Sequence, residues 1–170
     1  MALKTAVATV AVLLAAGCGG AAIDQAPTAS MSSIDAAPHM TSPDTAKNVY
    51  VANTDANTVT VYEPGKSQLL RKISHDISAA DALAFDGSGN LYVANGGASP
   101  VTVYPPAGTY ALRTIEQGIE APIALAFGSN HYLNVANSFF SITEYAPGSN
   151  KLVRKITKGI NYPASLAFGP

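Results

Sequence analysis

One motif returns along this sequence at an almost constant spacing. Asn53, Asn95 and Asn137 each end a short apolar run, and successive members of this set are 42 residues apart. Three more sets keep the same spacing, with one residue fewer in the last interval: Tyr62, Tyr104 and Tyr145; Ile73, Ile115 and Ile156; Phe85, Phe127 and Phe168. The chain must therefore fold as successive copies of one structural unit.

Each period contains four short runs rich in β-branched and aromatic residues. In the central copy these are 82–85, 91–95, 101–104 and 112–115, and Gly, Pro, Asn and Ser separate them. Such runs predict antiparallel strands, which we name a, b, c and d in chain order. Four strands in a period of about 40 to 45 residues indicate an all-β fold, a β-propeller of four-stranded antiparallel blades.

The copies amount to three blades, and the first begins in its middle. The order is b, c and d over 49–73, then two complete a-b-c-d sets, then a lone a run at 164–168. We expect this last run to complete the first blade, either in its own chain or in a partner chain. Closed propellers usually have about four to eight blades. Three arrangements therefore stay open: a ring of two chains, a piece of a longer propeller with further blades, or an open arc.

Three stretches carry a resemblance to a known repeat family. They are NLYVAN at 90–95, VTVYPP at 101–106 and APIALAF at 121–127. These stretches resemble the NHL and YVTN-type propeller repeats of exported bacterial proteins, and the resemblance extends over 48–170. It implies the propeller fold. It implies no particular activity, because such folds serve as enzymes, receptors and scaffolds alike.

The N-terminal region predicts export. Residues 1–17 combine one positive charge, Lys4, with a short apolar run and small residues, as in a signal peptide. The only cysteine, Cys18, follows Leu14-Ala15-Ala16-Gly17, which resembles a bacterial lipobox and implies lipidation. Ala15 stands where a lipobox usually has Leu, so ordinary cleavage is the alternative. Residues 18–47 are small, polar and interrupted by Pro, which predicts a flexible tether. We expect a periplasmic or cell-surface protein that is held to the membrane by lipid alone.

The alternation of strand direction places the b–c and d–a loops at one end of every blade, which we call the loop face. The candidate binding residues on this face are Phe139, Phe140, Tyr162, Asp55, Asp81 and Glu120. Apolar rings in loops suggest contact with a ligand or partner, here a protein or a carbohydrate. The formal net charge of −1 argues against nucleic acid. We expect a non-catalytic binding module with no catalytic residue, metal or cofactor.

Two alternative functions stay open. The repeat also resembles gluconolactonase-type propellers, which implies a divalent cation such as Ca²⁺ held by Glu, Asn and Asp side chains near the starts of inner strands. The corresponding residues are Asp81, Ile123 and Ala164, of which only Asp81 is a ligand for such a cation. One alternative is thus a metal-dependent lactonase- or esterase-like enzyme that uses Asp81. The other is a truncated fragment of a longer propeller with no independent function.

Two sets of repeated polar residues have structural interpretations. The Asn at the end of each b strand is expected to bond its own turn. Arg71, Arg113 and Arg154 share one position of strand d, where charge protects the outer edge of a sheet from further pairing. The third copy departs from the pattern, since Asn134 replaces a tyrosine and Glu144 a valine. We expect these two polar side chains to pair with each other or with solvent, or to indicate a decaying copy of the repeat.

Overall fold

The fold is all-β. The computed structural model describes residues 47–97 and 100–169, and within these ranges the chain forms eleven strands and no helix. The strands are β1 (Val49–Asn53), β2 (Thr58–Tyr62), β3 (Leu69–Ile73), β4 (Ala80–Phe85), β5 (Leu91–Asn95), β6 (Val101–Tyr104), β7 (Arg113–Ile115), β8 (Pro122–Phe127), β9 (Leu133–Asn137), β10 (Ser141–Tyr145) and β11 (Leu152–Ile156). Every predicted b, c and d run, and two of the three a runs, is confirmed as a strand.

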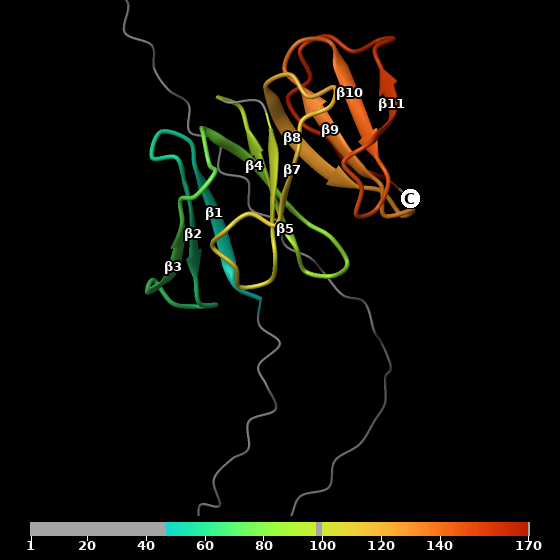
Figure 1. The fold of residues 1–170 in the computed structure, drawn as a ribbon. Coiled ribbons are helices and arrows are strands. Elements are labelled where there is room, and N and C mark those ends of the chain that lie inside the picture. The colour runs from blue at the N-terminus through green and yellow to red at the C-terminus, as the bar shows by residue number, and fades with distance from the viewer. Residues whose placement is uncertain (1–46, 98–99, 170) are drawn as a thin grey trace, which may run out of the picture.

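The strands form three antiparallel sheets, which lie side by side in Figure 1. The first sheet contains β1–β3, the second β4–β7 and the third β8–β11, each in the order of the chain. All neighbours in a sheet are consecutive strands joined by short turns, which is the meander that the Gly, Pro and Asn spacing predicts. The sheets do not close into a barrel, and their arrangement is consistent with a partial propeller arc.

The innermost strands carry small residues and pack sheet against sheet. β4 and β8 are in contact, and β1 is in contact with β4. One apolar core lies between the first and second sheets and includes Val59, Ile73 and Val93. A second core lies between the second and third sheets and includes Val103, Ile115 and Val135. Strands β5 and β9 are buried along their whole length, as expected for strands with a sheet neighbour on each side and a packed sheet on their faces.

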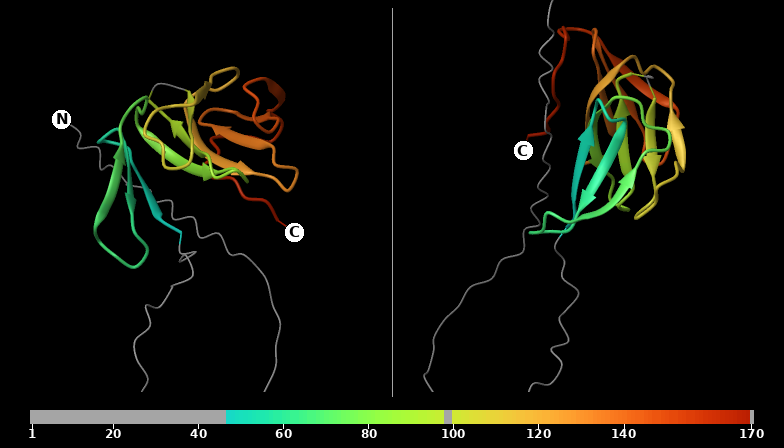
Figure 2. Two further views of the ribbon diagram at one scale, coloured as in Figure 1. Left: turned by 60° about the horizontal axis from the view of Figure 1, so that its bottom comes forward. Right: turned by 90° about the vertical axis from the view of Figure 1, so that its left-hand side faces the viewer.

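The expected final a strand does not form in the single chain. Residues 164–169 have no strand pairing, and Phe168 is 56% exposed although its ring lies against Gly128 of the third sheet. Among the residues that the structure describes, the first sheet accordingly has three strands rather than four. The physical reason is position: the open edge of β1 is at one end of the arc, while the C-terminal segment leaves the third sheet at the other end (Figure 2). Completion of the first blade by its own chain was therefore wrong for the isolated chain.

The N-terminal expectations lie outside the described residues. These are the export signal 1–17, Cys18 and all of the tether 18–47 except Lys47. In the ranges 47–97 and 100–169 no helix has the length and apolarity needed to cross a membrane.

Candidate functional site

The d–a loops repeat one backbone conformation three times. Asp76, Gly118 and Gly159 have φ of 55°, 78° and 77°, and three residues later Ala79, Ala121 and Tyr162 have φ of 50°, 48° and 45°. The left-handed region favours Gly, so a non-Gly residue held there in every copy needs support from its surroundings. That support comes from the neighbouring b–c loops.

The repeated Asn residues join the two kinds of loop. Asn95 Oδ1 accepts a hydrogen bond from the Ser78 backbone N–H at 2.9 Å, while its Nδ2 donates to Pro100 O and to Thr102 Oγ1. Asn137 repeats this arrangement and accepts from the Glu120 N–H at 2.8 Å. The prediction that these residues bond their own turn was correct for the amide N–H groups only, because the amide oxygen binds the d–a loop of the preceding repeat. The b–c and d–a loops therefore meet at one end of the sheets, as the loop face requires.

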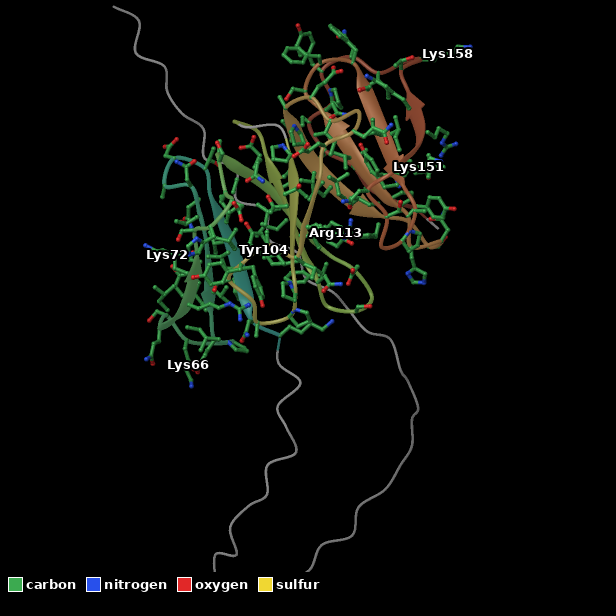
Figure 3. The ribbon with its side chains drawn as sticks, in the orientation of Figure 1. Lys66, Lys72, Tyr104, Arg113, Lys151 and Lys158 are labelled. Atoms are coloured by element: carbon green, nitrogen blue, oxygen red, sulfur yellow. The ribbon has the colours of Figure 1, made fainter. Side chains whose placement is uncertain are left out.

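Buried tyrosines make a second connection between successive sheets. Tyr104 Oη donates to His75 O, and Tyr145 Oη donates to Gln117 O, in both cases in the preceding d–a loop. Burial raises the pKa of Tyr104 to about 12 and raises that of Tyr145. Both hydroxyls thus stay protonated donors over the physiological pH range. Figure 3 shows Tyr104 between the first and second sheets.

Three of the candidate binding residues come together on the loop face. Phe139, Phe140 and Tyr162 are 50%, 51% and 66% exposed. The Tyr162 N–H donates to Phe139 O at 3.2 Å, and the rings of Phe140 and Tyr162 meet edge to face with centroids 5.2 Å apart. We call these three residues the aromatic patch. It is confined to the third repeat, because the small residues Ala79 and Ala121 occupy the position of Tyr162 in the other copies.

Within the described residues, the three acidic candidates do not gather into a group that could hold a metal ion. Asp55 is exposed in the β1–β2 turn. Glu120 lies in the d–a loop before the third sheet, where its carboxylate is 3.4 Å from Lys155 Nζ on β11. Both of these side chains are substantially exposed, so the ion pair contributes little to stability. The acidic residues therefore do not form a joint site.

Asp81 occupies a bulge at the start of an inner strand. The register of β4 shifts between Ala80 and Ala82, and the equivalent shift in β8 leaves Ile123 in the same position. The Asp81 carboxylate accepts a 3.4 Å hydrogen bond from the Thr54 hydroxyl and packs so closely on Gly96 that a Cβ there would stand 2.0 Å from Oδ2. Burial raises the pKa of Asp81, and the Thr54 bond opposes this only in part.

The surroundings of Asp81 supply few cation ligands. Across residues 47–97 and 100–169, no three His, Cys, Asp or Glu side chains gather into a group that could hold a metal ion. Hard divalent cations take about six to eight oxygen ligands. The described residues thus bring together one carboxylate and one hydroxyl at the position where the gluconolactonase resemblance implies a cation.

The arginines of strand d do more than protect an edge. Tyr50, Val61 and Arg71 stand opposite one another across β1, β2 and β3. The Arg71 guanidinium reaches over the valine, donates to Tyr50 Oη at 3.0 Å and lies 5.7 Å from the ring centroid. The second sheet repeats this with Tyr92 and Arg113, at 2.7 Å and 5.5 Å. The sequence contains the signal for this contact, namely the constant offset of 21 residues between the two columns.

Arg113 also connects the second sheet to the third. Its guanidinium donates to Ser149 O at 3.2 Å and to Asn150 Oδ1 in the β10–β11 turn, and Figure 3 shows it between the two sheets. The Tyr92 ring in turn packs edge to face on Phe127, with centroids 5.0 Å apart. The interpretation as edge protection was therefore incomplete for Arg71 and Arg113, which pack on tyrosine rings of their own sheets.

An open pocket of about 390 Å³ lies beside this contact, at the end of the sheets opposite the loop face. Asp86, Tyr92, Phe127 and His131 contribute to its lining. Burial acts to raise the pKa of Asp86, but hydrogen bonds from Asn90, the Ser88 N–H and Tyr92 outweigh it and lower the pKa. The Asp86 carboxylate is thus already hydrogen-bonded within the protein.

One of the two departures in the third sheet, Glu144, forms an ion pair with an arginine. Asn134, Glu144 and Arg154 stand opposite one another across β9, β10 and β11, in the row where the other sheets have Tyr, Val and Arg. The Glu144 side chain is only 11% exposed, and its Oε2 lies 2.9 Å from Arg154 Nε. The arginine therefore pairs with its immediate neighbour instead of reaching a tyrosine. The sequence predicted that Glu144 would contact Asn134 or solvent. The structure instead shows it paired with Arg154.

Comparison with known proteins identifies the type of fold only. No protein-family model matches the sequence, and no curated protein matches it. The structure is similar to hydrazine synthase of Kuenenia stuttgartiensis, with TM-score 0.62 and 20% identity over 69% of this chain and 34% of that one. It is also similar to the computationally designed Ika4 protein, with TM-score 0.58 and 23% identity over 72% and 74% of the two chains. A protein of unknown function from Bacteroides caccae gives TM-score 0.52 and 22% identity over 68% and 43%.

These similarities extend to the β-rich architecture and no further. The chain spans about a third of the hydrazine synthase chain and less than half of the Bacteroides caccae protein. At such identities a shared fold does not carry a shared activity.

Proposed function

We propose that this chain is an exported, lipid-anchored propeller repeat module of NHL type that binds a protein partner through its loop face and catalyses no reaction. The observation that carries this proposal is the aromatic patch, in which three large rings stand exposed on adjoining loops of one repeat. Large exposed rings are depleted on ordinary surfaces, while Phe and Tyr are enriched where proteins meet.

The shape of the patch favours a protein over a sugar. Phe139 and Phe140 form the tip of the β9–β10 turn and Tyr162 the adjoining d–a loop, so the rings project rather than line a cavity. Small ligands generally occupy concave sites that cover most of their surface. Projecting rings suit insertion between the side chains of a broad partner surface, with Glu120 and Lys155 as charged groups in the same repeat.

A photo-reactive phenylalanine analogue at position 140 tests the partner directly. In cells that produce the protein naturally, we expect irradiation to give one discrete protein adduct, because Phe140 is half exposed at the centre of the patch. Tyr162→Ala should reduce its yield about tenfold, the effect of removing roughly 1.4 kcal/mol from an interface ring. The matched control is the same analogue at Val153, which is equally exposed, at 54%, on outer strand β11. Equal adducts at both positions, or adducts to polysaccharide only, would contradict the proposal.

The anchor is proposed from sequence, because Cys18 lies outside the described residues. Support comes from the signal-like 1–17 and the lipobox-like Leu14–Cys18, followed by a polar tether long enough to carry the sheets away from a bilayer. A fatty-acid probe should label the full chain, and Cys18→Ser should abolish the label. Ala15→Leu, which restores the usual lipobox residue, should label at least as well. Labelling that persists in the Cys18→Ser chain would remove the anchor from the proposal.

A further inference from the structure

The two ends of the arc carry the two halves of one repeat. At one end, no strand of residues 47–97 and 100–169 pairs with the inner edge of β1, and its residues are more exposed than their equivalents. Val51, Ala52 and Asn53 are partly exposed, whereas the same positions in β5 and β9 are completely buried. At the other end, residues 163–168 follow the third sheet in extended form without a sheet partner. An exposed sheet edge can pair with an added strand, and a segment with the sequence of a strand can supply one.

The loop before the C-terminal segment already has the conformation that leads into an inner strand. Gly159 and Tyr162 have φ of 77° and 45°, matching the loops that precede β4 and β8. The Ile160 N–H donates to Thr157 O at 3.2 Å, just as the Ile119 N–H donates to Glu116 O at 3.1 Å. Pro163 stands at the start of the segment as Pro122 stands at the start of β8. The segment thus has the preceding loop of an inner strand, and within the described residues it has no strand partner.

We propose that Pro163–Phe168 of one copy adds to the β1 edge of a second copy as its fourth strand, and that the exchange is reciprocal. The repeat spacing determines the register. Because Pro122 pairs with Asn137, Ala124 with Ala136 and Phe127 with Leu133, the intermolecular pairs are Pro163 with Asn53, Ser165 with Ala52, Leu166 with Val51, Ala167 with Tyr50 and Phe168 with Val49. The bulge at Asp81 and Ile123 recurs at Ala164.

The same register also offers hydrogen-bond partners to Asn53 and Tyr62. In the described part of the single chain these two residues lack contacts that their equivalents in the other sheets make. Within the described residues Asn53 Oδ1 accepts no bond from a d–a loop, although Asn95 and Asn137 do. In the exchanged pair the equivalent donor is the Asn161 N–H. Tyr62 is likewise only partly buried, and its equivalent acceptor is Lys158 O, the counterpart of His75 O and Gln117 O. The arrangement that joins the first sheet to the second and the second to the third then joins one copy to the other.

Reciprocal exchange explains why a second copy is a better occupant than an unrelated strand. An added strand needs the right alternation of side chains and the right loop before it, and the segment has both because it descends from the same repeat. Two copies related by a two-fold axis would each complete the other, giving two identical junctions between them. This inference does not depend on the aromatic patch or on its partner.

Cysteine pairing tests the register. In a Cys18→Ser background of the full chain, the Ala52→Cys and Ser165→Cys proteins are mixed and mildly oxidised. We expect a disulfide-linked species of twice the chain mass, since paired residues on adjacent strands have Cβ atoms about 4.5 to 5.5 Å apart. The matched control pairs Ala52→Cys with Ala167→Cys, which is displaced by two residues, and should give about tenfold less product. Equal yields from the two pairs, or a monomer by light scattering, would overturn the proposal.

A proline separates loss of assembly from loss of fold. Ala167 is exposed and unpaired in the single chain, so Ala167→Pro should leave the circular dichroism spectrum unchanged. The same substitution prevents regular strand addition, so the mass by light scattering should fall from two chains to one. Proline at Ser129, an exposed residue of the β8–β9 turn, serves as the control and should keep the mass of two chains. A two-chain mass that survives Ala167→Pro would show that the copies associate by another surface.

Discussion

Asn95→Ala should lower the free energy of unfolding by about 3 kcal/mol, because three polar groups lose a hydrogen-bond partner at once. The Asn95 side chain is completely buried and connects Ser78 N–H, Pro100 O and Thr102 Oγ1. An alanine can make none of these three hydrogen bonds, and each buried polar group that is left unsatisfied costs about 1 to 3 kcal/mol. Urea unfolding followed by circular dichroism measures the loss.

The matched control for this change is Asn130→Ala. Asn130 sits in an exposed turn, where its Oδ1 accepts one 3.2 Å bond from the Tyr132 N–H and solvent can replace it. We expect a loss of about 0.5 kcal/mol, as for most surface substitutions. Asn137→Ala should match Asn95→Ala, since it breaks the same connection one repeat later. Similar losses at Asn95 and Asn130 would mean that the loop connection does not stabilise the sheets.

Arg154→Ala should cost about 2 kcal/mol, although the arginine itself is mostly exposed. The reason is its partner, since the Glu144 side chain is 11% exposed and lies at a position that valine occupies in the other two sheets. Removing one member of a well-buried pair typically costs about 3 to 5 kcal/mol, and the 58% exposure of Arg154 lets water recover part of that. Thermal and urea unfolding at neutral pH give the difference.

A double-mutant cycle isolates the charge contribution. Glu144→Val places the residue of Val61 and Val103 at this position and removes the carboxylate. In that background Arg154→Ala should cost less than about 0.5 kcal/mol, as expected for an exposed side chain with no counter-ion to serve. If Arg154→Ala is equally costly in both backgrounds, the arginine stabilises the sheet by packing alone and the pair contributes nothing.

The strands and the loop face were predictable because both follow from local pattern. Runs such as Leu91–Asn95 and Leu133–Asn137 alternate with strong turn signals, so their pairing in a meander needed no knowledge of distant contacts. Strand alternation then determined which loops share an end, and the meeting of Phe140 with Tyr162 followed. The spacing of the repeats also predicted that the sheets follow one another in chain order, which a single repeat could not have shown.

Contacts that cross strands or sheets were harder to predict from the sequence. Arg113 reaches Tyr92 over an intervening valine, so only a three-strand register reveals the contact. The amide oxygen of Asn95 serves the preceding repeat, which local turn preference does not indicate. The C-terminal run had every property of a strand, yet a strand needs a partner edge, and fixing each residue without one costs about 1 to 2 kcal/mol.

The connections that the repeated Asn and Tyr residues make between sheets run backwards along the chain. Asn95 holds a loop 17 residues before it, and Tyr104 one that lies 29 residues before it. On the ribosome, each such loop emerges first and waits for the side chains that secure it, a delay of a few seconds at about 5 to 20 residues per second. Through these two residues a newly made sheet secures the loop that was made before it, whereas Arg113 waits for Ser149 and Asn150 of the sheet that follows.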